Sequence, residues 1–139
     1  MQSMKPILLV EDDTIDARTV KRALQDLRTE TPLINLADGE EALRYLQNDQ
    51  NARPCIILLD LNMPRMNGIE FLRVVKADDN LKTIPVIVLT TSKEERDVVD
   101  SFDLCVAGYI VKPVGYEQFV EIIRTIDHYW SLSQLPAEV

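Results

Sequence analysis

A fivefold alternation between short apolar runs and segments of helical periodicity constrains the fold of this chain more than any other feature. The apolar runs are continuous, which is typical of strands buried on both faces of a sheet. Because helical segments separate them, the strands must pair in parallel through right-handed crossovers, with helices covering both faces. The expected strands are 6–10, 33–37, 55–59, 85–89 and 107–111.

Apolar residues recur at steps of three and four in the intervening segments, which is the spacing of one helix face. Asp12 and Asp13 stand where either would cap the first helix, and Asp38 where it would cap the second. Five strand–helix units suit an open, doubly wound α/β sheet and are too few for an eightfold barrel. The helices are marked by Ala17, Val20, Leu24 and Leu27, by segment 38–46, by Ile69, Leu72 and Val75, by Val98, Val99 and Phe102 within 92–104, and by Phe119, Ile123, Ile126 and Trp130.

Composition narrows the classes of function. The 139 residues hold 15 Lys and Arg against 23 Asp and Glu, a net charge of −8. This length fits one domain, and the acidic balance argues against nucleic-acid or membrane-surface partners, which need clustered cations. No apolar run approaches the roughly 20 residues that span a bilayer, and the apolar start is too short for a signal peptide. We therefore expect a cytoplasmic protein.

Histidine and glycine are too scarce in this sequence for some common kinds of site, and the two cysteines have a plain structural role. The single histidine, His128, excludes a histidine-cluster metal site and is expected at the surface of the last helix. Four glycines are too few and too scattered to form a phosphate-cradling loop. Cys55 and Cys105 lie in apolar stretches, and we expect both to be buried, reduced thiols.

Polar residues with complementary chemistry follow four of the five strands. In open α/β sheets, ligands bind outside the carboxyl ends of the strands. Carboxylates held together raise one another's pKa or require a cation, and Mg²⁺ prefers such oxygen ligands. Three carboxylates, an ammonium and a hydroxyl are the groups that phosphoryl transfer uses. They come from Glu11, Asp12, Asp60, Thr90 and Lys112.

Each of these signals also has a plainer structural explanation. Acids after a strand often only cap the next helix, and the Thr90-Thr91-Ser92 segment has the composition of a helix N-cap. An aspartate such as Asp60 is common in turns, as is a Lys-Pro step. The functional hypothesis rests on all four segments meeting at one edge of one sheet.

The same segments resemble the receiver domain of two-component response regulators, in order and in spacing, over roughly residues 5–129. The resemblance implies a flavodoxin-like fold with strand order 2-1-3-4-5. The matching motifs are Leu9-Val10-Glu11-Asp12-Asp13, Leu58-Leu59-Asp60-Leu61-Asn62-Met63-Pro64, Met66-Asn67-Gly68, segment 85–90 ending in Thr90, and Gly108-Tyr109-Ile110-Val111-Lys112-Pro113.

The resemblance implies a role for each site residue. Asp60 would be the phosphoacceptor and one ligand of Mg²⁺. Asp12 would bind the metal directly, Glu11 would hold it through water, and the backbone carbonyl of Asn62 would complete the protein's ligands. These assignments make the protein a signalling switch that catalyses only its own phosphorylation and dephosphorylation.

The remaining implied roles concern the response to phosphorylation. Thr90 and Lys112 would contact the new phosphoryl group, and the Tyr109 ring would turn inward as Thr90 moves. The surface made by segment 92–104, strand 107–111 and the last helix would then change. Asn62 and Ser92 would tune hydrolysis. The family also implies a cis peptide bond before Pro113, which costs only about 0.5–1 kcal/mol.

Two segments resemble the small regulators paired with phytochrome-type histidine kinases: 101–109 and 128–136. We therefore expect a histidine kinase partner, and a bacteriophytochrome in particular. Residues 1–130 would be a stand-alone receiver, and 131–139 a short extension. That extension and the switching surface would form a homodimer, unless Trp130 packs on its own domain. The apolar ending consists of Tyr129, Trp130, Leu132 and Leu135.

Other readings of the same residues remain open. A metal-dependent phosphatase could use Asp60 as nucleophile, but Asn62 stands where such enzymes place a general acid. A receiver-like adaptor could bind partners constitutively, although the intact acidic set argues against it. A flavin protein of the same fold would need donors where these loops are acidic.

Overall fold

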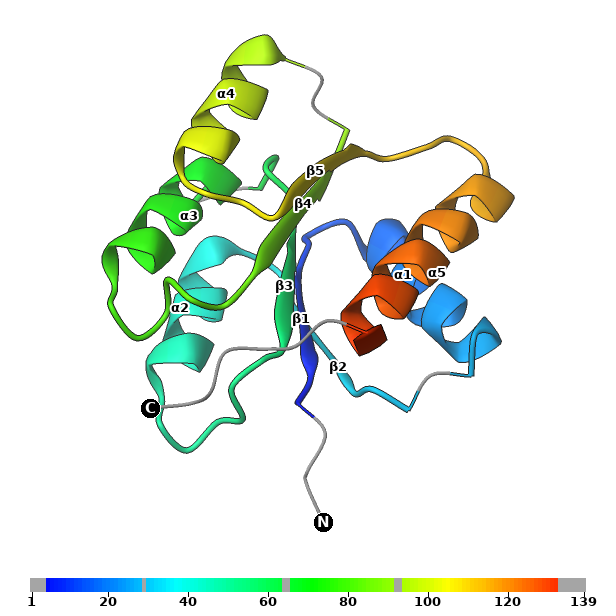
Figure 1. The fold of residues 1–139 in the computed structure, drawn as a ribbon, viewed down its shortest axis with the longest axis horizontal. Coiled ribbons are helices and arrows are strands. Elements are labelled where there is room, and N and C mark those ends of the chain that lie inside the picture. The colour runs from blue at the N-terminus through cyan, green and yellow to red at the C-terminus, as the bar shows by residue number, and fades with distance from the viewer. Residues whose placement is uncertain (1–4, 29, 64–65, 92–93, 133–139) are drawn as a thin grey trace.

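The structure is a computed structural model that describes residues 5–28, 30–63, 66–91 and 94–132. One five-stranded parallel sheet alternates with five helices, and its strand order β2-β1-β3-β4-β5 confirms the predicted fold (Figure 1). The elements are β1 (Ile7–Val10), α1 (Thr14–Asp26), β2 (Leu33–Leu36), α2 (Gly39–Gln47), β3 (Ile56–Leu59), α3 (Gly68–Ala77), β4 (Val86–Thr90), α4 (Glu95–Asp103), β5 (Gly108–Val111) and α5 (Tyr116–Leu132).

The register aligns the carboxyl ends of the strands at one edge of the sheet. Val10 at the end of β1 pairs with Leu59 at the end of β3, and Thr90 at the end of β4 pairs with Val111 of β5. The Asp60 amide then donates to the Val10 carbonyl at 3.0 Å. The residues that follow these strands are therefore neighbours in space, although the chain separates them widely.

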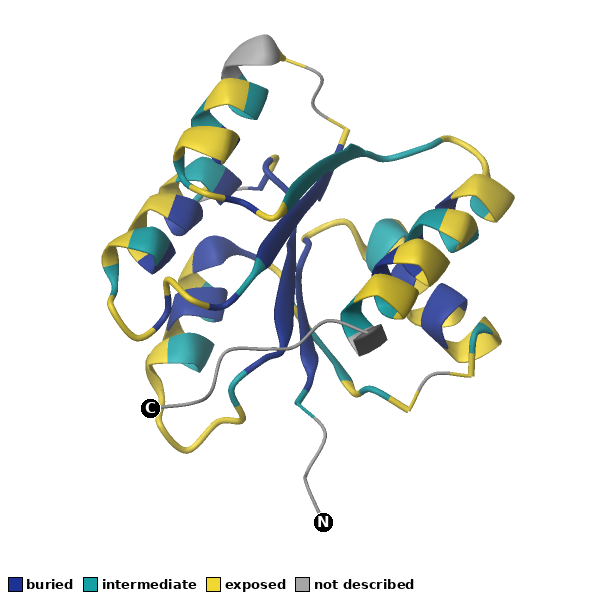
Figure 2. Cartoon of the chain, in the orientation of Figure 1, coloured by how far each residue is buried: buried dark blue, intermediate teal, exposed yellow. Residues whose placement is uncertain are grey.

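Two apolar cores lie on opposite faces of the sheet, because alternate strand residues point to opposite sides. Helices α1 and α5 cover one face, and α2, α3 and α4 cover the other (Figure 1). The central strands β1, β3 and β4 are buried between these layers, whereas the edge strands β2 and β5 are mostly half-buried (Figure 2). The α2–α3 core includes Leu8, Val10, Ile57, Leu59, Phe71 and Leu72, and the α1–α5 core includes Ile7, Leu9, Ile56, Leu58, Phe119 and Ile123.

Side-chain caps fix where three of the helices begin. Asp13 accepts hydrogen bonds from the amides of Ile15 and Asp16, and Asp38 accepts one from the amide of Glu41. The caps at Asp13 and Asp38 are therefore confirmed, and Asp13 rather than Asp12 is the N-cap of α1. Asn67 and Glu70 form a reciprocal capping box at the start of α3. These caps hold the strand-to-helix loops that carry the candidate site.

Helix α4 differs from its prediction. It begins at Glu95, and its N-cap residue, Glu94, makes no side-chain cap hydrogen bond. Val99 and Phe102 are about half exposed, at 51% and 53%, whereas Ser101 is buried. The apolar residues of this helix therefore lie partly on its outer face, where burial against the sheet does not account for them.

Two further predictions are wrong. Cys105 is exposed, because the apolar stretch around it forms the turn after α4, where Cys105 has a left-handed φ of 61°; only Cys55 is buried. The bond before Pro113 is trans, since it lies within the described residues and none of the peptide bonds there is cis. Trans is the lower-energy isomer of an X–Pro bond by about 0.5–1 kcal/mol.

The end of the chain was predicted to carry an apolar dimer contact, with packing of Trp130 on its own domain as the alternative. Trp130 packs against the α1–α5 core of its own domain, while Tyr129 is 60% exposed and His128 is exposed as expected. Leu135 lies outside the described residues. Among the helices that the structure describes, none is long and apolar enough to cross a membrane.

Candidate functional site

The predicted site residues converge at the carboxyl edge of the sheet. Glu11 and Asp12 follow β1, Asp60 follows β3, Thr90 ends β4 and Lys112 follows β5. The Lys112 amide donates to the Thr90 carbonyl at 2.7 Å, which ties the ends of the last two strands together. The topology therefore places these side chains at one corner of the molecule.

Three carboxylates meet there at metal-binding distance. Glu11, Asp12 and Asp60 each offer an oxygen, and these oxygens lie within 4.8 Å of one another. Glu11 and Asp60 are only 3% and 6% exposed, whereas Asp12 faces solvent. The buried Oδ1 atom of Asp60 accepts no hydrogen bond from any residue that the structure describes. A buried, unsatisfied carboxylate oxygen beside two other acids fits a hard divalent cation such as Mg²⁺.

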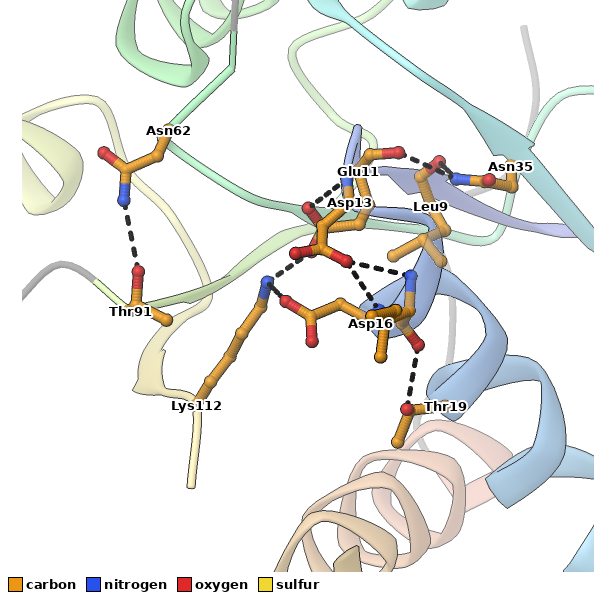
Figure 3. A network of polar contacts seen from close by, with 10 residues as sticks. Leu9, Glu11, Asp13, Asp16, Thr19, Asn35, Asn62, Thr91 and Lys112 are labelled. Atoms are coloured by element: carbon orange, nitrogen blue, oxygen red, sulfur yellow. Dashed lines mark hydrogen bonds and ion pairs between the residues drawn. The ribbon is translucent and has the colours of Figure 1, made fainter. Parts of the chain in front are cut away.

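Lys112 supplies the positive charge of the site. Its side chain is 6% exposed, and its ammonium group donates to Glu11 and, at 2.8 Å, to Oδ2 of Asp16 on α1 (Figure 3). Asp16 is the more accessible partner, because its side chain is 32% exposed against 2% for Glu11. The ammonium therefore lies between the strand edge and the first turn of a helix.

Burial and neighbouring charges shift the acid–base behaviour of Glu11 and Lys112. Desolvation raises the pKa of Glu11 to about 8; the hydrogen bond from Lys112 opposes this rise, and the charge of Asp60 adds to it. Burial acts to lower the pKa of Lys112, but hydrogen bonds to Asp16 and Glu11 outweigh it, so this pKa is raised. Lys112 therefore remains a cation, whereas the ionised form of Glu11 is disfavoured until a second cation offsets its burial.

The remaining predicted residues surround this centre. Thr90 is fully buried beside the acids, and Tyr109 is half-buried and packs against the α2–α3 core. Asn62 is exposed in the loop after β3, where its amide group donates to Oγ1 of Thr91 at 3.4 Å. Pro64 and Ser92 lie outside the described residues.

An open groove borders the acidic cluster at Asp12. It has a volume of about 420 Å³, which is far larger than the roughly 30 Å³ share of one water molecule. A phosphodonor group or attacking water could therefore approach along it. The groove is lined by Asp12, Leu61, Asn62, Met63, Asn67, Ile69 and Asp97.

Two polar residues of the site were not predicted from the sequence. Asp16 contacts Lys112 from the first turn of α1, and its place only four residues after Asp12 could have indicated that it lies near the same corner. Asn35 on β2 donates its amide to the carbonyls of Leu9 and Glu11, at 3.1 and 3.3 Å, and so holds the end of β1. A lone asparagine inside an apolar strand was the available signal for it.

Comparison with known proteins gives one consistent result. The family model described as response regulator receiver domain matches residues 7–124. The chain is 40% identical to the response regulator Rcp1 of Synechocystis sp. over 130 residues, which are 91% of this chain and 88% of Rcp1. The crystal structure of the Mn²⁺-bound form of Rcp1 has a TM-score of 0.89 and covers 96% of this chain and 99% of its own.

Two phytochrome response regulators are also similar in structure. The phosphorylated cyanobacterial phytochrome response regulator RcpA is 38% identical, with a TM-score of 0.90 over 97% of this chain and 100% of its own. The bacteriophytochrome response regulator AtBRR is 38% identical, with a TM-score of 0.75 over 96% of this chain and 99% of its own. These likenesses extend over the site as well as the fold, because they cover nearly the whole chain.

Proposed function

The chain belongs to the response regulator receiver domain family, whose members are phosphoryl-accepting signalling switches, and on that premise we propose that Asp60 is its phosphoacceptor. The observation that supports this role most directly is the buried Oδ1 of Asp60, which has no hydrogen-bond partner among the described residues. Glu11 and Asp12 lie within 4.8 Å of it, and the groove beside Asp12 opens to solvent. Asp60 thus lies in an acidic cluster whose exposed member, Asp12, borders an open groove.

The chemistry of the transfer follows from these groups. A carboxylate oxygen of Asp60 attacks phosphorus and forms a new P–O bond, while the P–N bond of a phosphohistidine breaks and the imidazole leaves with the electron pair. Glu11, Asp12, Asp60 and the carbonyl of Asn62 would hold Mg²⁺, which when bound offsets the charge of the phosphoryl oxygens. The protein thereby catalyses only its own phosphorylation and dephosphorylation.

Phosphorylation would be communicated through Thr90, Lys112 and Tyr109. The phosphoryl group adds a charge of about −1.5 to −2 and strong acceptor oxygens at Asp60. Thr90 and Lys112 can donate to that charge from the neighbouring strand ends. Tyr109 lies on β5 and would fill the space that Thr90 leaves, which would change the surface formed by α4, β5 and α5. The new contacts would bias an equilibrium between two conformations.

The phosphodonor would be a histidine kinase of the phytochrome type. This proposal rests on the likeness to Rcp1, RcpA and AtBRR, the last two of which are phytochrome response regulators. We place the exchange in the cytoplasm, where histidine kinases draw their phosphoryl group from ATP. Profiling phosphotransfer from the histidine kinases of the source organism would identify the donor. Preferential transfer from a histidine kinase of another type would contradict the proposal that the donor is of the phytochrome type.

Acetyl phosphate and Mg²⁺ test the acceptor directly. We expect intact-mass spectrometry to find one added phosphoryl group, stable in acid and labile in base, on the wild-type protein. Asp60→Asn should remove the modification, because the amide is a poor nucleophile. Asp26→Asn is the matched control, since Asp26 lies on α1, where it accepts a hydrogen bond from the Tyr116 hydroxyl. Equal phosphorylation of Asp60→Asn and wild type would refute the assignment.

We further propose that the protein forms a homodimer through α4, β5 and α5, with segment 131–139 contributing. Val99 and Phe102 on α4 and Tyr129 on α5 expose large apolar side chains that the fold itself does not cover. Light scattering after size exclusion should give a dimeric mass for wild type and a monomeric mass for Phe102→Glu. Ile15→Glu is the control, because Ile15 is 72% exposed on α1, outside this surface. A monomeric wild-type protein, with or without phosphorylation, would contradict the proposal.

A further inference from the structure

The ammonium group of Lys112 is engaged by two carboxylates, and neither of them belongs to Asp60. It donates to Glu11 and to Oδ2 of Asp16, the latter at 2.8 Å (Figure 3). At the same time Oδ1 of Asp60 is buried and accepts no hydrogen bond within the described part of the chain. The cation of the site thus lies beside the acceptor without satisfying it.

A phosphoryl group on Asp60 would change this balance of charge. Its additional negative charge and acceptor oxygens would appear next to Asp60, which already interacts electrostatically with Lys112. Glu11 and Asp16 accept from the Lys112 ammonium at present, so a movement of that group toward the phosphoryl oxygens would weaken these hydrogen bonds. The two carboxylates that now hold Lys112 therefore compete with the phosphoryl group for one ammonium.

Of these two carboxylates, Asp16 is the one that can release Lys112 at lower cost. Its side chain is 32% exposed, so water can replace the ammonium there, whereas the Glu11 side chain is only 2% exposed and is not open to water. Asp16 also lies in the first turn of α1, where the helix dipole stabilises a negative charge. Both features lower the cost of separating Asp16 from Lys112.

We propose that Asp16 is a positioning residue that holds Lys112 away from the acceptor before phosphorylation and competes with the phosphoryl group afterwards. The inference rests on the proposed role of Asp60, and it adds a residue of α1 to a site otherwise built from strand ends. Its consequence is that Asp16 disfavours the phosphorylated state. The exchange of one ion pair for another makes the switch easier to reverse.

Binding of beryllofluoride, a mimic of the phosphoryl group, to the Mg²⁺-saturated protein tests this competition without any catalytic turnover. We expect Asp16→Asn to bind beryllofluoride about two- to fivefold more tightly than wild type, because binding no longer has to break a partly exposed ion pair between Asp16 and Lys112. Asp16→Ala should bind at least as tightly, since alanine cannot accept a hydrogen bond. Asp16→Glu keeps the carboxylate and should restore an affinity close to that of wild type. Isothermal titration calorimetry measures all four proteins.

Asp26→Asn on the same helix is the control for the change of one charge, and it should match wild type. Circular dichroism confirms that each variant is folded, and Asp16→Ala replaces Asp16→Asn if the latter is not. Unchanged or weaker binding in the folded Asp16→Asn and Asp16→Ala variants would overturn the role of Asp16 and leave Asp60 as the acceptor. Failure of wild type itself to bind beryllofluoride would overturn the proposed function together with this inference.

Discussion

At the scale of single residues, Glu11 is the acid whose charge depends most on its surroundings. Desolvation raises its pKa from 4.5 to about 8, in spite of the hydrogen bond from Lys112. The folded, metal-free protein therefore binds a proton at Glu11 that the unfolded chain releases above about pH 4.5. Glu11 contributes stability below that pH, and this contribution is lost as the pH rises through about 8.

Mg²⁺ must displace this proton, so its affinity should depend on pH. Below about pH 8 we expect the dissociation constant for Mg²⁺ to rise by up to about tenfold for each unit by which the pH is lowered, because one proton is released on binding. Calorimetric titration with Mg²⁺ from pH 6 to 8.5 measures this slope. Glu11→Gln should bind Mg²⁺ more weakly and with a flatter dependence. The same slope in both proteins would show that Glu11 is not the titrating group.

The two cysteines should differ sharply in reactivity. Cys55 is buried and burial raises the pKa of its thiol, whereas Cys105 is exposed in the turn after α4. A thiol reagent should modify one cysteine rapidly in the native protein and both in urea. Cys105→Ser should remove the rapid phase. Rapid modification of both thiols in the native wild type would contradict the placement of Cys55.

At the scale of elements, the junction between β3 and α3 fixes the acceptor through close backbone contact. A Cβ atom on Gly68 would lie 2.6 Å from Cα of Leu61 and 2.7 Å from the carbonyl oxygen of Asp60. The amide of Gly68 also donates to the Leu61 carbonyl at 3.1 Å. The start of α3 therefore packs directly on the backbone that carries Asp60.

Gly68→Ala should destabilise the protein by about 1–3 kcal/mol, because the obstructing atoms belong to the backbone and cannot rotate away. It should also weaken Mg²⁺ binding, since the loop after Asp60 must shift. Gly108→Ala is a matched control: its nearest neighbours are side-chain atoms of Ile87 at 3.9–4.0 Å, so a change within about 0.5 kcal/mol is expected. Urea unfolding measures both variants. Equal unfolding midpoints for the two would argue against this close contact.

The elements also show what the sequence could and could not predict. Continuous apolar runs predicted all five strands, and polar residues after the strands predicted the acidic cluster, because parallel strands end at one edge. Asp16 was missed since a helix residue near the site looks like an ordinary first-turn acid. The exposure of Phe102 and Cys105 was missed because hydrophobicity does not distinguish a core-facing residue from one on an outer face or in a turn.

At the scale of the whole molecule, one sheet is shared by two apolar cores. The strands alternate their side chains between the α1–α5 core and the α2–α3 core, so neither core can form without the strands of the other. The acidic site lies at the edge of this sheet, while Trp130, the single tryptophan, packs on the α1–α5 core. Changes on one face should therefore reach the other through the strands.

Trp130 can report whether the two faces unfold together. Leu72→Ala removes a fully buried side chain from the α2–α3 core and should cost about 2–5 kcal/mol. Because the sheet is common to both cores, Trp130 fluorescence on the opposite face should show the same lower urea midpoint as far-UV circular dichroism. Both signals are measured at one protein concentration, so that any association of the chains affects them equally. If the fluorescence transition kept its wild-type midpoint while the dichroism transition moved, the two faces would be separate cooperative units and the coupling between them would be excluded.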